Sequence, residues 1–191
     1  MLNNFASNDR ACQFIHTQQL PGADAMSTRD QTEVSARPLR LLVPINANQH
    51  SRWGVQYALR CQRQGVRVEV ILLNVGEPIT QWEVLRFRTQ QEIEQFQSER
   101  AQAFIEEASQ ELAENDIAYR GVFKQGELVF SILDTAEELD CDEIVMPSPK
   151  TRLSGLFSGD IVSTVVKQQR AIPVVFVDDQ GHTLLPGRVL Q

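Results

Sequence analysis

The hydrophobic residues of this chain begin to follow a regular pattern near residue 41. Leu41–Ile45 is a continuous apolar run, which is typical of a strand buried on both faces. Apolar residues then recur at helical spacing over 52–64, with Ser51 expected as the N-cap and Gly65 as the residue that ends the helix. Residues 66–75 read as a second apolar strand. The chain therefore opens with a strand, helix, strand unit, whose default is a right-handed parallel crossover.

The alternation of strands and helices continues to residue 177. Such an alternation predicts one α/β domain, a doubly wound, five-stranded parallel sheet with helices on both faces. The glutamates of the first long helix fit a solvent-facing surface better than a cation site. The expected elements are a helix over 82–115, a short edge strand over 117–123, a helix over 128–139, a strand over 143–146, a helix over 161–169 and a strand over 173–177.

The two ends of the chain lack this pattern. Residues 1–38 are polar and carry turn formers, so we expect a disordered N-terminal tail, with Met26 as an alternative start. Residues 39–178 form the expected α/β domain. Residues 179–191 contain turn residues and are expected to be a C-terminal tail.

Composition narrows the class of partner. Of the 191 residues, 42% are hydrophobic and 23% charged, as in an ordinary globular domain. The net charge of −7 repels phosphates, which argues against nucleic-acid binding. No apolar run approaches the roughly 20 residues that span a bilayer, and no secretory signal is recognisable. We therefore expect a cytoplasmic protein with no nucleic-acid or membrane partner.

Residues suited to catalysis or metal binding are scarce. The three cysteines, Cys12, Cys61 and Cys141, have no CxxC spacing, which argues against a disulfide framework or a zinc site and favours reduced packing residues. No GxSxG or HExxH motif occurs, and His50 fits the start of a helix better than a general base. We therefore expect no catalytic residues and no metal.

The ends of the strands are the places to look for a ligand. In doubly wound folds, ligands bind at the carboxyl ends of the central strands. Here those ends are Ile45-Asn46, Val75-Gly76 and residues 146–150. Lys150 and Arg152 offer positive charge for a small phosphorylated ligand, although a solvated or ion-paired state is the simpler interpretation.

Two segments resemble the universal stress protein family. Residues 39–59, LRLLVPINANQHSRWGVQYAL, are similar to the opening strand and helix of that family. Residues 125–177, QGELVFSILDTAEELDCDEIVMPSPKTRLSGLFSGDIVSTVVKQQRAIPVVFV, resemble its C-terminal half. The resemblance covers about residues 39–178 and implies an adenine-nucleotide alpha-hydrolase-like fold with a nucleotide loop after the fourth strand.

The nucleotide loop departs from the family pattern of Gly, two residues, Gly, nine residues, then Gly and a hydroxyl residue. Aligned without gaps, the three glycine positions fall on Met146, Pro149 and Gly159, with Ser148 between the first two and Asp160 at the hydroxyl position. Glycines allow positive φ and close approach of phosphate to backbone amides, which methionine and proline do not.

Two further departures concern charge. Asp160 places a carboxylate where phosphate would go, although it also suits a helix N-cap. The family's adenine-side aspartate corresponds to Asn46, which keeps hydrogen-bonding capacity but loses the charge. The degenerate site implied by the resemblance comprises Ile45, Asn46, Val75, Met146, Ser148, Pro149, Gly159 and Asp160.

These residues lead to a first hypothesis and two alternatives. The first is a non-enzymatic stress-response or regulatory protein with weak or absent ATP binding and an unknown protein partner. The resemblance implies a homodimer through the closing strand, Pro173, Val174, Val175, Phe176 and Val177, whose apolar edge would be exposed in a monomer. One alternative is an ATP sensor or slow ATPase that uses the degenerate loop. The other, an enzyme of another doubly wound family, lacks converging catalytic groups.

Overall fold

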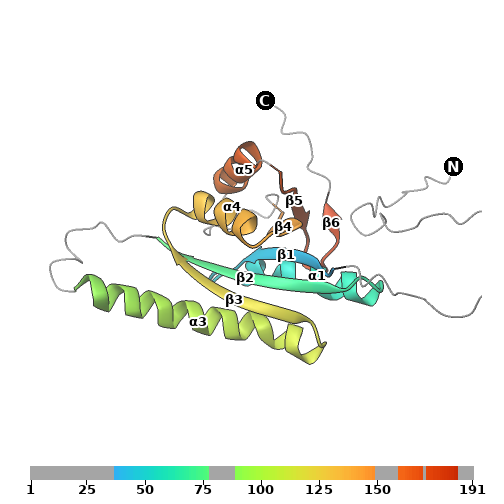
Figure 1. The fold of residues 1–191 in the computed structure, drawn as a ribbon, viewed down its shortest axis with the longest axis horizontal. Helices are drawn as coiled ribbons and strands as arrows, with labels where there is room; N and C mark the ends of the chain where they lie inside the picture. The colour runs from blue at the N-terminus through green and yellow to red at the C-terminus, as the bar shows by residue number, and fades with distance from the viewer. Residues whose placement is uncertain (1–36, 78–88, 149–158, 170, 185–191) are drawn as a thin grey trace, which may run out of the picture.

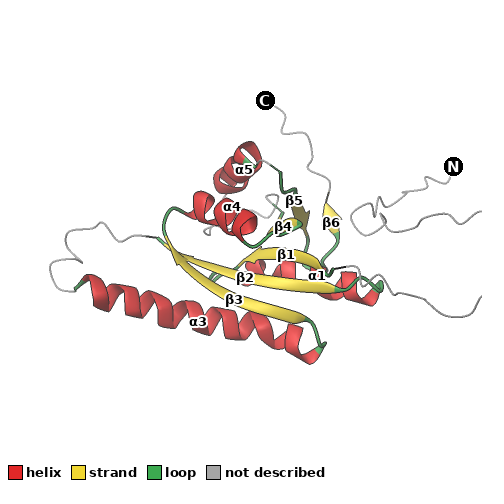
Figure 2. Cartoon of the chain, viewed as in Figure 1, coloured by secondary structure: helices red, strands yellow, loops and turns green. Residues whose placement is uncertain are grey.

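The computed structural model describes residues 37–77, 89–148, 159–169 and 171–184. They form one mixed sheet with two helices on each face (Figures 1 and 2). Among these residues, no helix has the length and apolar character needed to cross a bilayer. In chain order the elements are β1 Leu39–Pro44, the 3₁₀ helix η1 Gln49–Arg52, α1 Trp53–Arg63, β2 Val68–Gly76, α3 Gln90–Glu114, β3 Ala118–Gln125, α4 Leu128–Glu138, β4 Glu143–Pro147, α5 Gly159–Gln168, β5 Val174–Val177 and β6 Thr183–Leu184.

The predicted fold class is confirmed. The strand order is β3-β2-β1-β4-β5-β6, and the first five strands run parallel. The continuous apolar run of β1 is explained by two cores that pack against opposite faces of this strand. Leu41 and Val43 face α1 and α3, whereas Leu42 faces α4 and α5. The part of a strand that is covered on both faces needs apolar side chains, which Leu41, Leu42 and Val43 provide.

The residues predicted to begin and end the helices can be compared with the structure. Gly65 has φ +85°, a conformation that suits the residue after a helix and confirms its predicted role. The predicted N-cap at Ser51 is wrong, because η1 precedes α1 and the Asn48 side chain caps η1. Helix α3 begins after Thr89, whose side chain forms a capping box with Glu92, and its expected first residues 82–88 lie outside the described part.

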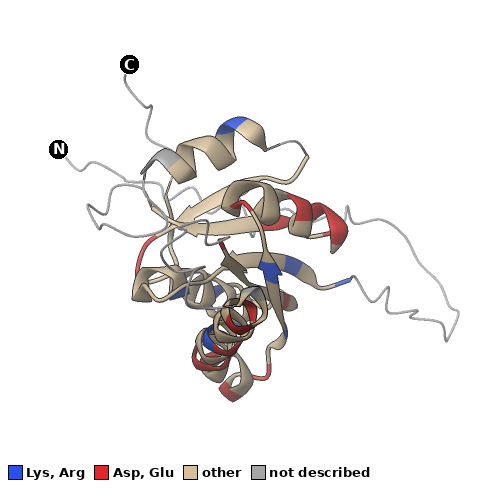
Figure 3. Cartoon of the chain, turned by 90° about the vertical axis from the view of Figure 1, so that its left-hand side faces the viewer, with Lys and Arg blue, Asp and Glu red and all other residues tan. Residues whose placement is uncertain are grey.

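The long helix α3 carries its charges toward solvent, as predicted. Ile93, Ala101, Ala108 and Leu112 are the apolar side chains that it buries. Acidic positions recur along this helix in Figure 3, and Glu94, Glu99, Glu106, Glu111 and Glu114 are exposed. The glutamate-rich composition of this segment is therefore a solvated helix surface.

The expected all-parallel sheet of five strands has a sixth strand. Residues 183–184 form β6, which pairs antiparallel with β5 through Phe176–Leu184 and Val177–Thr183. The expectation that residues 179–191 are only a tail is therefore wrong for this part of them. The expectation that β5 presents a free edge in a single chain is also wrong, because β6 occupies that edge at Phe176 and Val177.

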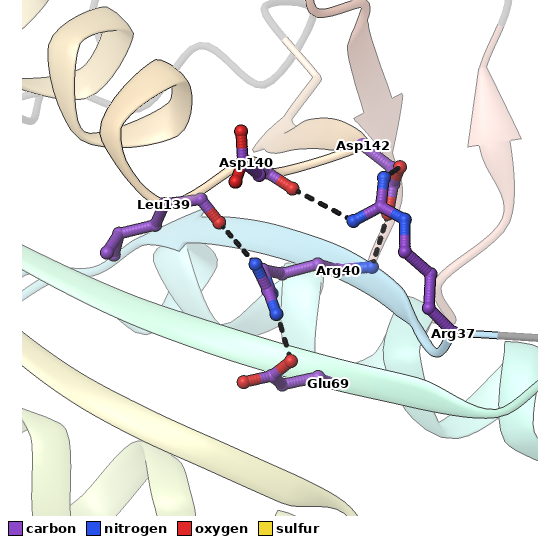
Figure 4. A network of polar contacts seen from close by, with 6 residues as sticks. All are labelled: Arg37, Arg40, Glu69, Leu139, Asp140 and Asp142. Atoms are coloured by element: carbon purple, nitrogen blue, oxygen red, sulfur yellow. Dashed lines mark hydrogen bonds and ion pairs between the residues drawn. The ribbon is translucent and has the colours of Figure 1, made fainter.

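A network of polar contacts joins three parts of the chain at the amino ends of the strands (Figure 4). The Arg40 guanidinium donates to Glu69 Oε2 at 2.9 Å and to the carbonyl of Leu139, the C-cap residue that follows α4, at 2.6 Å. The backbone N–H of Arg40 donates to Asp142 Oδ2 at 2.8 Å, and Arg37 forms an ion pair with the same carboxylate. These contacts fix β1, β2 and the turn before β4 at the edge opposite the strand ends where ligands would bind.

A buried acid lies at the start of β4. Glu143 is 8% exposed and accepts a hydrogen bond from the Tyr57 hydroxyl at 3.0 Å. Burial raises the pKa of Glu143, and the Tyr57 hydrogen bond only partly offsets this. Because the folded protein holds this proton more tightly than the unfolded chain, ionising Glu143 opposes folding.

We predict that Glu143→Gln stabilises the protein at neutral pH. The contribution of Glu143 to stability is fully present below its ordinary pKa of 4.5 and is lost as pH rises toward the raised value. The melting temperature of Glu143→Gln should therefore exceed that of wild type at pH 7, and the difference should close near pH 4. The exposed Glu114→Gln serves as the control. Tyr57→Phe should cost about 1–3 kcal/mol because it leaves a buried acceptor unpaired. If the melting temperatures of Glu143→Gln and wild type differ by the same amount at pH 7 and at pH 4, this explanation is wrong.

We predict that Cys61 and Cys141 resist thiol reagents while the protein is folded. Cys61 is fully buried and Cys141 is 6% exposed. Burial raises the pKa of the Cys141 thiol to about 11, so about one part in a thousand is thiolate at pH 8. Peptide mass spectrometry after alkylation should find both residues unmodified in buffer and fully modified in denaturant. Rapid alkylation of either residue in buffer would indicate a reactive thiol instead of a packing residue.

Candidate functional site

The candidate site lies where the strand order reverses. β1 pairs with β2 on one side and with β4 on the other. β3 therefore extends the sheet on the β2 side, and β5 and β6 extend it on the β4 side. The helical connections after β1 and β4 therefore diverge, and the carboxyl ends of these two strands flank the switch point of the fold. The described residues that follow these strands are Ile45, Asn46 and Ser148.

The turn after β1 is held by short polar side chains. The backbone N–H of Asn46 donates to Ser51 Oγ at 3.2 Å, and Asn46 Oδ1 accepts from the N–H of Asn48 at 2.7 Å. The Ser51 hydroxyl in turn donates to the carbonyl of Asn48 at 2.6 Å. Asn46 and Ser51 are 6% and 1% exposed, so this is a buried, internally bonded turn.

One polar atom of this turn stands out. The amide nitrogen of Asn46 is buried and has no hydrogen-bond partner among the residues that the structure describes. Exchanging the two ends of the amide would not help, because Asn46 Oδ1 already accepts from Asn48. An unpaired buried donor costs about 1–3 kcal/mol, and such groups are rare in native structures. The side-chain amide oxygen of Asn46 is therefore already used, and the hydrogen-bonding capacity that remains is that of its N–H groups.

The neighbouring strand adds a second buried amide. Asn74 in β2 is 8% exposed and donates from Nδ2 to the carbonyl of Ile45 at 2.8 Å. This bond from β2 holds Ile45, the first residue after β1, in place. Asn48, Ser51 and Asn74 were not among the residues predicted for this site. The run Asn46-Ala47-Asn48 directly after a buried strand is the signal that was available.

Several residues of the predicted site belong to the cores. Met146 is fully buried in the core under α4 and α5, and Val75 packs against that same core. Ile45 lies in the other core, with α1, so the sheet separates its side chain from that of Val75. Ser148 is 8% exposed, and its N–H donates to the carbonyl of Val177 at 2.9 Å.

The rest of the predicted loop is only partly described. Gly159 and Asp160 form the first turn of α5. Pro149, Lys150 and Arg152 lie outside the described residues. The structure therefore brings together Asn46 and Ser148 at adjacent strand ends.

The described side chains directly after β1 and β4, Asn46, Asn48, Ser51 and Ser148, are neutral. Amide and hydroxyl groups there can bind a small polar molecule through hydrogen bonds, but they supply no strong acid or base. His50 bonds through Nδ1 to Asn48 Oδ1, and its ring meets Trp53 edge-on at 4.8 Å, which supports a role at the start of the helix. Within the described ranges, no cluster of three or more His, Cys, Asp or Glu side chains could hold a metal ion.

The chain is similar in fold to solved universal stress proteins. The protein UspA from Lactobacillus plantarum aligns with a TM-score of 0.56 at 16% identity, covering 74% of this chain and 99% of its own. A family member from Burkholderia pseudomallei gives 0.56 at 12% identity, covering 73% of this chain and 95% of its own. A family protein from Arabidopsis thaliana with AMP bound gives 0.54 at 14% identity, covering 74% of this chain and 92% of its own.

The sequence itself supports the same assignment. Among curated proteins, no sequence matches this chain. The model of the universal stress protein family matches residues 39–178, which is most of the chain and the whole of the described sheet up to the end of β5. The chain therefore belongs to the universal stress protein family.

Proposed function

We propose that this chain is a non-enzymatic regulatory protein of the universal stress protein type, which acts as a homodimer through protein contacts and binds ATP weakly or not at all. The observation that carries this proposal is the neutral, self-bonded turn after β1. Most of the hydrogen bonds in this turn join its own residues, Asn46, Asn48 and Ser51, to one another. A triphosphate needs cationic or backbone N–H partners, which these side chains do not supply.

The position of Met146 supports weak nucleotide binding. Its side chain fills the core under α4 and α5 and is fully buried. A glycine there would leave a cavity in this core, so the methionine stabilises the domain at a position where the nucleotide-binding pattern has glycine. Pro149 and Asp160 alter the same pattern in the sequence, by removing an N–H donor and by adding a negative charge.

A second function, a nucleotide sensor or slow ATPase, is favoured by one specific observation. The unpaired amide nitrogen of Asn46 is a buried donor at the switch point, and a ligand with an acceptor atom would satisfy it. The Arabidopsis thaliana relative was solved with AMP and another universal stress protein with cAMP. Under this alternative, Asn46 and Ser148 would contact the ligand.

Calorimetric titration with ATP and magnesium distinguishes these functions. We expect no saturable binding at micromolar protein for wild type. Asp160→Ser removes a negative charge at the phosphate position and should increase affinity, whereas Asp179→Ser makes the same charge change in the exposed turn after β5 and should not. Saturable wild-type binding that Asp160→Ser leaves unchanged and Asn46→Ala abolishes would favour the sensor. Release of phosphate in that titration would favour the slow ATPase.

A further inference from the structure

The edge of β5 is closed by a segment of the same chain. β6 follows β5 after a five-residue turn and pairs antiparallel with it through two residue pairs (Figure 1). An uncovered edge strand presents free N–H and C=O groups to other strands. β5 carries the apolar sequence Val-Val-Phe-Val, so it is an edge that another strand would pair with readily.

The turn before β6 is specifically anchored. Asp178 Oδ1 accepts from the N–H groups of Gln180 and His182 at 2.9 and 2.8 Å, and Asp178 Oδ2 lies 3.2 Å from His182 Nδ1. Burial alone would raise the pKa of Asp178, but the hydrogen bonds from His182 and Gln180 lower it below its usual value. The carboxylate therefore organises the turn that delivers β6 to the edge.

The turn also packs directly on helix α1. Gly181 has φ +70°, and a Cβ there would lie 2.5 Å from the backbone of Gln56 and Tyr57. Only glycine allows both the backbone conformation and the close approach. A single methyl group at residue 181 would therefore break the contact between this turn and α1.

The cap itself is small. It covers Phe176 and Val177 only, while Val174 and Val175 remain half-exposed. Leu184, the last residue of β6, is 36% exposed, so the cap buries little apolar surface of its own. A two-residue strand with so little packing opens at low free-energy cost compared with the rest of the sheet.

We propose that β6 is an exchangeable cap, which a second copy of the chain displaces when the β5 strands of two copies pair antiparallel. The proposal rests on the homodimer proposed above and adds its regulation. The backbone groups of Phe176 and Val177 pair with β6 or with the second copy, and the two states exclude each other. Antiparallel pairing of β5 with itself generates a two-fold axis and sets one apolar strand against a second copy of the same apolar strand. Dimerisation is therefore reduced by whatever holds β6 in place.

A pair of glycine variants tests whether opening the cap promotes dimerisation. Gly181→Ala expels the turn from α1, whereas Gly65→Ala has similar backbone strain at φ +85° with no atom within 4 Å of the added carbon. Light scattering across micromolar concentrations should show at least a several-fold tighter dimer for Gly181→Ala than for wild type or Gly65→Ala. Hydrogen exchange should show faster exchange at residues 183–184. If Gly181→Ala does not fold, Asp178→Ala releases the same turn by removing its acceptors.

A disulfide lock gives the opposite test. Val177→Cys with Thr183→Cys, in a Cys12→Ser background, places two thiols on directly opposed residues of β5 and β6. The oxidised form should stay monomeric at concentrations where the reduced form dimerises. A dimer that persists in the oxidised form would overturn the cap and leave a homodimer through another surface. A monomer in every variant, with residues 183–184 exchanging freely in Gly181→Ala, would overturn both the homodimer and the cap.

Discussion

The central strand β1 is the constraint on which the rest of this structure depends. It is paired on both edges, and its central residues Leu41, Leu42 and Val43 are fully buried between the two cores, so none of these three can be polar. It separates two cores, one formed with α1 and α3 on one face of the sheet and the other with α4 and α5 on the opposite face. Toward the carboxyl end of the sheet, the first polar side chain after this buried segment is Asn46, and it gathers with its partners at the switch point.

The same constraint explains what the sequence could predict. Continuous apolar runs identified β1, β2, β4 and β5, because burial of a strand between two layers of helices leaves a strong signal, and helical spacing identified the helices between them. The exposed β3 was predicted only as a short edge strand. β6 left no such signal, since Thr183 and Leu184 are held by the turn at Asp178 and the contact at Gly181 rather than by a pattern of their own. The contact of Gly181 with Gln56 and Tyr57 joins residues far apart in sequence, and only the folded chain brings them together.

Prediction of the candidate site was limited for a related reason. Asn46 was identified because it follows a strand. Its hydrogen bonds in the turn, from the N–H of Asn48 to its side-chain oxygen and from its own N–H to Ser51 Oγ, could not be predicted in this way. The predicted helix cap at Ser51 was wrong because its hydroxyl is used inside this turn, and Asn48 caps η1 instead. Local propensity names residues that are able to cap a helix, and the geometry of the turn decides which one does.

The two edges of the sheet are protected in different ways, and their burial explains why. β3 is exposed along most of its length, so it tolerates Arg120 and Lys124, and Lys124 pairs with Asp134 and Glu138 on α4. Charges of this kind discourage pairing with other strands. β5 cannot use them, because Phe176 and Val177 are needed in the two cores and are 5% and 0% exposed. An edge that must remain apolar can only be covered, and a cover that is small and held by a single turn is one that a competing strand can replace.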